Sequence, residues 1–172
     1  MSRHLIALLS LALCLALSAC TTGEPEEKAK VEAAPEVLHA PATSDDKEWK
    51  IYLQKVVSQN MAGVTDRVFP YYLPANSTVP SPDDPESRSQ YDRQLDNVAS
   101  VLARTVYPGN MLVFGSPDSA KMADLLVAAV STGKPDALKG SQILFIGKAE
   151  DNARVRAAAE AVGAKYIFVE AK

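Results

Sequence analysis

The fold is decided by residues 111–169, which read MLVFGSPDSAKMADLLVAAVSTGKPDALKGSQILFIGKAEDNARVRAAAEAVGAKYIFV. Three short apolar runs in this stretch, residues 111–114, 142–146 and 166–169, alternate with two segments whose apolar side chains recur at helical spacing. Buried strands that alternate with amphipathic helices are typical of a βαβαβ unit, whose parallel sheet is covered by helices on both faces. We therefore expect an α/β fold with a small parallel sheet and right-handed crossovers.

Two further helices are predicted in the part of the chain that precedes this unit. The first covers about residues 45–60, where apolar residues recur at helical spacing and Ser44 stands in the N-cap position. The second covers about residues 87–106, where Ser87 and Gln90 have the spacing of a capping box. The expected fold thus has two additional N-terminal helices beside its βαβαβ half.

The segment between these two helices is rich in proline. Residues 64–73 carry β-branched and aromatic side chains, but Pro70 interrupts them, and this predicts a short edge strand or an extended segment. Residues 74–86 hold four prolines, which predict an irregular exposed loop. Tyr71 and Tyr72, beside this loop, can either form a platform for a ligand or pack partly against the core, and we favour packing.

Charge is distributed unevenly along the 172 residues, whose formal net charge is −3. Residues 20–48 contain eight acidic residues, three lysines and few large apolar side chains, so they cannot bury enough surface to offset the entropy lost on ordering. We interpret residues 20–47 as a disordered acidic tether and residues 48–172 as a single α/β domain. The acidic balance provides no general attraction to a phosphate backbone, so we expect no nucleic-acid partner.

Residues 1–19 have the pattern of an export signal. Arg3 precedes an apolar run from Leu5 to Leu17, which only Ser10 interrupts, and small residues follow the run. The run is shorter than the apolar stretch that a transmembrane helix needs. We therefore expect this segment to be removed from the mature protein.

The end of this segment, Leu17-Ser18-Ala19-Cys20, resembles the lipobox of bacterial lipoprotein precursors. The resemblance implies that the Cys20 thiol is alkylated with diacylglycerol, that the peptide bond before Cys20 is cut, and that the new amino terminus is acylated. Several acyl chains on one residue supply the multiple hydrophobic signals that stable membrane anchoring requires. Thr21, instead of Asp, after the cysteine resembles the class of lipoproteins sorted to the outer membrane. We expect a lipid anchor there and a domain that faces the periplasm, with the inner membrane and the cell surface as alternative locations.

Few side chains remain for catalysis once the signal is removed and Cys20 is lipidated. Cys14 lies in the signal peptide, so we expect no free thiol in the mature domain. His4 lies in the same segment and His39 in the predicted tether, so we expect no histidine in the folded part. Catalytic triads with histidine and zinc sites built on His or Cys are thereby excluded. The sequence also lacks G-x-G-x-x-G and Walker motifs, so we expect no cofactor and favour a non-enzymatic role.

A candidate ligand site follows the first two strands of the βαβαβ unit. Ligands of parallel α/β sheets usually bind beyond the carboxyl ends of the strands, near the N-termini of the helices that follow. The side chains predicted at this place are two hydroxyls, two cations and one amide: Ser116, Ser119, Lys148, Asn152 and Arg154. Together with backbone N–H groups they can hold a phosphate or a carboxylate.

A purely structural interpretation of the same loops is available. Ser116-Pro117-Asp118 is an ordinary helix start with proline at the first helical position, and Asp151 or Asn152 is an ordinary N-cap. We favour this structural interpretation over the anion site.

These observations favour a lipid-anchored envelope protein that acts as a non-enzymatic accessory or interaction subunit of an envelope assembly. The lipid anchor makes the membrane one partner, and we expect an envelope protein as the other. The alternative is a periplasmic binding module for a small anionic ligand or a cell-wall fragment. A hydrolase that relies on carboxylates alone is the third hypothesis.

Overall fold

The computed structural model of the protein describes residues 36–81, 83, 86–104 and 106–172. The predicted signal peptide at 1–19, Cys20 and the tether as far as residue 35 lie outside these residues. The described part of the chain therefore comprises the domain and the last part of the segment that leads into it.

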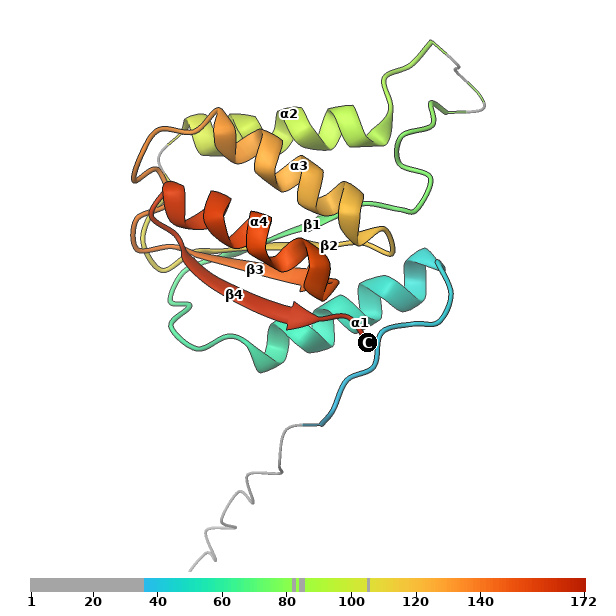
Figure 1. Cartoon of the computed structure of the whole chain (residues 1–172), viewed down its shortest axis with the longest axis horizontal. Helices are drawn as coiled ribbons and strands as arrows, with labels where there is room; N and C mark the ends of the chain where they lie inside the picture. Colours follow the sequence, from blue (N-terminus) through green and yellow to red (C-terminus); the bar gives the residue numbers. More distant parts are fainter. Residues whose placement is uncertain (1–35, 82, 84–85, 105) are drawn as a thin grey trace, which may run out of the picture. The chain divides into compact units, whose positions relative to one another are not determined.

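The described residues of the domain form four helices and four strands (Figure 1). In chain order they are α1 (Asp46–Gln59), β1 (Val68–Tyr72), α2 (Gln90–Ala103), β2 (Met111–Gly115), α3 (Ser119–Ser131), β3 (Gln142–Gly147), α4 (Ala149–Ala161) and β4 (Lys165–Glu170). All four strands are parallel, and their order in the sheet is β1-β2-β3-β4. The prediction of an α/β fold with a parallel sheet, a βαβαβ C-terminal half and two additional N-terminal helices is confirmed.

The helices are divided unequally between the two faces of the sheet. Figure 1 shows α2, α3 and α4 side by side on one face and α1 on the other. Each strand lies next to the strand that precedes it in the chain, so the sheet grows in one direction. Three crossovers of the same hand then place their helices on the same face. The opposite face is covered by α1, which lies outside this repeated pattern.

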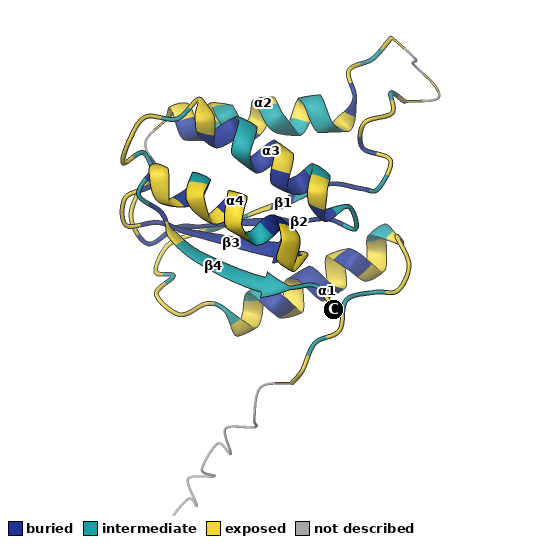
Figure 2. Ribbon diagram, in the orientation of Figure 1, coloured by how far each residue is buried: buried dark blue, intermediate teal, exposed yellow. Residues whose placement is uncertain are grey.

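Each face of the sheet has its own hydrophobic core. Under α2, α3 and α4 the core includes Leu112, Phe114, Ile143 and Phe145 from the sheet, and under α1 it includes Met111, Val113, Leu144 and Ile146. Both central strands, β2 and β3, are buried along their whole length (Figure 2). A strand buried on both faces is apolar at nearly every position, which explains the apolar runs in the sequence; Gln142, at the start of β3, is a buried polar exception.

The edge strand β1 accommodates its proline without losing a bond to the sheet. The Met111 N–H donates to the Arg67 carbonyl (2.8 Å) and the Leu73 N–H to the Gly115 carbonyl (3.4 Å). The backbone N–H and C=O groups of the odd-numbered residues of β1 therefore point toward β2. Pro70 therefore stands at a position whose backbone points away from the sheet, where no donor is needed. The prediction of a short edge strand that contains Pro70 is confirmed.

Two of the predicted helix caps are wrong by one or two residues. The N-cap of α1 is Asp45, not Ser44, and its Oδ1 accepts the N–H groups of Lys47 (3.0 Å) and Glu48 (2.9 Å). The N-cap of α2 is Ser89, because this helix begins at Gln90. Its hydroxyl accepts the Asp92 N–H (3.1 Å) and donates to the Asp92 carboxylate (2.6 Å), so an aspartate closes this cap.

The residues just before α1 lie against the domain, although their composition assigned them to the tether. The Ala40 N–H donates to the carbonyl of Lys172 (2.6 Å), two residues beyond the end of β4. The Trp49 indole N–H donates to the Thr43 carbonyl (2.8 Å). Leu38 is partly buried against the core under α1. The boundary drawn between residues 47 and 48 is therefore wrong, because residues 38–43 already contact the domain.

Replacing the observed cap of α1 tests this description of the helix start. Asp45→Ala removes the acceptor of two backbone N–H groups, and we expect the free energy of unfolding to fall by about 1 kcal/mol. Ser44 makes no hydrogen bond to another described residue, so Ser44→Ala is expected to change stability by less than about 0.5 kcal/mol. Urea unfolding followed by circular dichroism measures both. A larger loss for Ser44→Ala than for Asp45→Ala would contradict the observed cap.

Candidate binding site at the carboxyl ends of the strands

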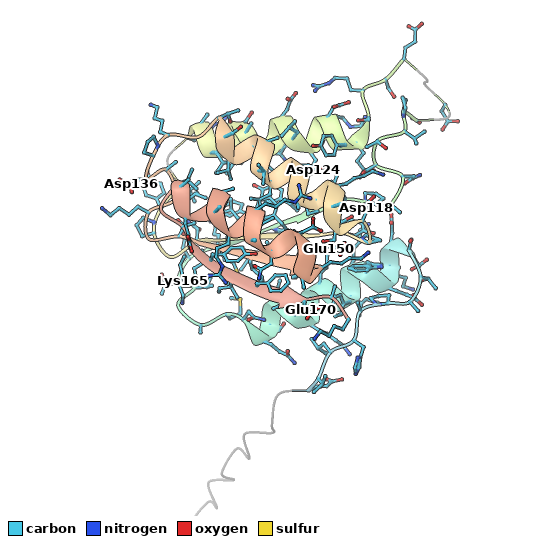
Figure 3. The ribbon with its side chains drawn as sticks, in the orientation of Figure 1. Asp118, Asp124, Asp136, Glu150, Lys165 and Glu170 are labelled. Carbon is cyan, nitrogen blue, oxygen red and sulfur yellow. The ribbon has the colours of Figure 1, made fainter. Side chains whose placement is uncertain are left out.

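The predicted site residues all come from the loops and helix starts that follow β2 and β3. Figure 3 shows this end of the domain, with Asp118 at the start of α3, Asp124 further along α3, and Glu150 at the start of α4. Two shallow cavities lie here, of about 310 and 380 Å³, and both are lined in part by Pro117, Ser119 and Lys148. The structure thus places the predicted residues in one region of the domain.

Ser119 is almost fully buried and connects the starts of α3 and α4. Its hydroxyl donates to Oδ2 of Asp151 (2.6 Å) and accepts the Lys148 N–H (2.8 Å). Asp151 is 5% exposed, and Ser119 is 4% exposed. A buried carboxylate needs hydrogen bonds to offset the loss of its hydration. The Ser119 hydroxyl is one of the groups that meet this need.

Arg154 is the second partner of the buried carboxylate. Its Nε (3.1 Å) and Nη2 (2.7 Å) both donate to Oδ1 of Asp151. Nη1 is paired with Asp124 of α3, and Nη2 also donates to the Ala120 carbonyl (3.0 Å). Hydrogen bonds to Asp124 and Asp151 raise the pKa of the Arg154 guanidinium above its ordinary value. The guanidinium joins α3 to α4, and each of its three nitrogen atoms donates to at least one acceptor of the protein.

Two more of the predicted residues hydrogen-bond within the domain. The Ser116 hydroxyl donates to the Leu73 carbonyl (2.7 Å) and accepts the Asp118 N–H (3.0 Å), and Ser116 is only 1% exposed. The Asn152 carbonyl oxygen accepts the Tyr166 hydroxyl (2.9 Å). Burial raises the pKa of Tyr166 to about 12, although the nearby positive charge of Arg156 opposes the shift. Tyr166 therefore remains a neutral donor at physiological pH.

Lys148 differs from the other four predicted residues. Its side chain is exposed, and no hydrogen bond or ion pair joins it to another described residue. It is also the N-cap residue of α4, a helix that has no side-chain cap. For α3 the alternative prediction holds in part: the helix does start beside this tripeptide, but its N-cap is Asp118, which accepts the Lys121 N–H (3.1 Å), and Pro117 precedes the cap instead of occupying the first helical position. The alternative prediction is wrong for α4, because Asp151 is turned toward Arg154 instead of capping the helix.

The topology of the sheet does not supply the crevice on which the site prediction relied. In open α/β sheets, the ligand crevice forms at the point where the strand order reverses, because the crossover helices on either side lie on opposite faces. The order β1-β2-β3-β4 contains no reversal, and the three crossover helices lie together on one face. The carboxyl ends of these strands therefore lack that kind of crevice.

A larger cavity than these two lies elsewhere, between α1 and the edge strand β1. It measures about 720 Å³. Tyr72 lines it, half-buried, with its hydroxyl donating to Asp46 (2.8 Å) and the Lys50 ammonium 5.3 Å from the centre of its ring. Tyr71 is buried and stacks on Phe114, with ring centres 5.0 Å apart. The prediction that the two tyrosines pack against the core is confirmed, but sequence reasoning did not find the groove beside them.

Comparisons with known proteins do not assign a function to the domain. No family model, no curated protein and no solved structure matches the chain. No helix in the described part of the chain is long and apolar enough to cross a lipid bilayer. Within the same residues, no group of three or more His, Cys, Asp or Glu side chains is arranged to hold a metal ion. Function must therefore be inferred from the residues themselves.

Substitutions of Arg154 and Lys148 separate a structural role from a free surface cation. Arg154→Ala leaves Asp151 with one fewer charged partner, and we expect the free energy of unfolding to fall by about 1–2 kcal/mol, reduced by the partial exposure of the guanidinium. Lys148→Ala removes no such contact, so we expect a change below about 0.5 kcal/mol. Urea unfolding measures both variants. Equal effects at the two positions would contradict the structural role of Arg154.

Proposed function

We propose that this protein is a lipid-anchored component of a bacterial cell envelope, held in the outer membrane through Cys20 with its domain facing the periplasm. The observation that carries the proposal is the sequence Leu17-Ser18-Ala19-Cys20 at the end of an apolar signal. The residues from Cys20 to the first described residue can span at most about 55 Å when fully extended. The anchor thus keeps the domain within that distance of the bilayer and raises its effective concentration near membrane-bound partners.

We propose a non-enzymatic interaction role for the domain. The hydrogen bonds of Ser116, Ser119 and Arg154 support this role, because these side chains are already hydrogen-bonded to other groups of the domain. A catalytic or ligand-binding role would require them to exchange these partners. The polar groups at the strand ends thus act mainly to hold α3, α4 and the preceding loops together, and the outer surface remains for contacts with an envelope protein.

Lipidation is tested by replacing the cysteine. The mature wild-type protein is expected to incorporate labelled palmitate and to fractionate with the outer membrane, because the acyl chains supply its hydrophobic attachment. Cys20→Ser is expected to lose the label and to keep its signal peptide, which mass spectrometry detects. Cys14→Ser is the matched control and should behave like the wild type. A wild-type product that carries no lipid would contradict the proposal.

A second candidate function, binding of a small anion, is favoured by one observation. The Lys148 side chain has no partner among the described residues and stands at the start of a helix without a side-chain cap. If this function holds, calorimetry with inorganic phosphate should detect binding that Lys148→Glu abolishes and Lys139→Glu leaves intact. Absence of binding to the wild type would reject the anion site and leave the interaction role in place.

A further inference from the structure

Among the described residues, one side of the edge strand β4 forms no backbone hydrogen bond between Lys165 and Glu170. The Lys165 N–H donates to the Ser141 carbonyl and the Ala171 N–H to the Gly147 carbonyl, both at 2.9 Å. The backbone N–H and C=O groups of the odd-numbered residues of β4 therefore point toward β3. Alternation along a strand then directs the N–H and C=O groups of Tyr166, Phe168 and Glu170 away from the sheet. No other described residue forms a backbone hydrogen bond with these three.

The two edges of the sheet are protected to different degrees. Pro70 occupies an outward-pointing position of β1, where its missing N–H interrupts the pattern that an added strand would need. β4 contains no proline, and its side chains between Lys165 and Glu170 are all apolar or aromatic and partly exposed (Figures 2 and 3). Proteins usually cover, charge or distort such an edge, because it otherwise pairs with another strand.

We propose that β4 pairs with β4 of a second copy of this chain, antiparallel and about a two-fold axis that passes beside Phe168. Such an axis is perpendicular to the sheet and keeps each side chain on its own face, so even-numbered residues pair with even-numbered ones. Centring the axis on Phe168 places this residue opposite its own copy and Tyr166 opposite Glu170 of the second copy. This register pairs every outward N–H and C=O of Tyr166, Phe168 and Glu170.

Charge complementarity favours a second copy as the occupant of this edge. The Arg156 guanidinium lies 5.0 Å from the centre of the Tyr166 ring, on the face covered by α2, α3 and α4. Glu170 is on the same face of β4, because it has the same parity as Tyr166. In the proposed register, Glu170 of each copy approaches Arg156 of the other. The pairing therefore brings together opposite charges twice, once on each side of the axis.

The ion pairs that Glu170 and Arg156 form within one copy do not prevent them from pairing with the second copy. Glu170 is paired with Lys172 at 2.7 Å, and Arg156 approaches Glu160 at 3.8 Å, but both pairs are largely exposed to solvent. Exposed pairs of this kind contribute little to stability and rearrange easily. Beyond Glu170 the free edge ends, because the Lys172 carbonyl accepts the Ala40 N–H. The pairing of two β4 strands does not depend on the proposed membrane anchor.

The test is the oligomeric state of the mature chain, residues 20–172 with Cys20→Ser, measured by sedimentation velocity over a wide range of concentrations. The wild-type sequence is expected to show a monomer–dimer equilibrium. Glu170→Arg and Arg156→Glu should each raise the dissociation constant of the dimer about tenfold, because each variant turns two symmetric attractions into repulsions. The double variant restores opposite charges and should recover dimerisation. Glu48→Arg, on α1, is the matched control and should have no effect.

Circular dichroism confirms that each variant is folded, so that a loss of association cannot be attributed to unfolding. A wild-type chain that stays monomeric up to about millimolar concentration would overturn the proposal, since even weak specific pairing is detectable there. A dimer that is indifferent to both single reversals would also overturn it, because that dimer must use another surface.

Discussion

The constraint on which the rest of the structure depends is the order of the strands, β1-β2-β3-β4, in a sheet that grows in one direction only. Parallel strands require crossovers, and crossovers of one hand and one direction place α2, α3 and α4 on the same face. The other face must then be covered by an element from outside the repeat, which here is α1. The same order leaves no reversal point at the carboxyl ends of the strands and leaves β4 as the open end of the sheet.

The helices on the crowded face are held in register by a polar network instead of by apolar contacts alone. Asp151 is buried between α3 and α4 and receives hydrogen bonds from Ser119 and Arg154, while Arg154 also reaches Asp124. A half-satisfied buried carboxylate would be costly, so the members of this network depend on one another. This dependence explains why residues with the chemistry of an anion site stabilise the fold instead. Contacts with a partner are then expected at the edges and outer surfaces of the domain.

The sequence was sufficient to predict the parts of the fold that are encoded by continuous patterns. The apolar runs at 111–114, 142–146 and 166–169 correspond to strands because a strand buried on both faces, or nearly so, admits few polar residues. The caps were missed because Ser44 and Asp45 are both good N-caps, and only the observed start of the helix distinguishes them. The packing of Leu38 and Ala40 was missed because two apolar residues in an acidic stretch give no periodic signal.

The candidate site shows a different limit of sequence reasoning. Ser119, Asp151 and Arg154 were correctly placed in one region, since the strands before them are neighbours in a parallel sheet. Nothing in their spacing indicates that they bond to one another across two helices. The open edge was equally invisible, because the outward direction of Tyr166, Phe168 and Glu170 follows from the parity of the ladder with β3, not from the residues themselves.

The central claim, that β4 is the open and self-complementary edge of a sheet wound in one direction, is tested most directly by residue-resolved amide hydrogen exchange along β4. At low protein concentration, the account predicts slow exchange at Lys165, Ile167 and Val169, whose amides face β3, and fast exchange at Tyr166, Phe168 and Glu170. At high concentration, the second group should become slow as well. Fast exchange of the second group at every concentration, or loss of the alternation at low concentration, would contradict the account.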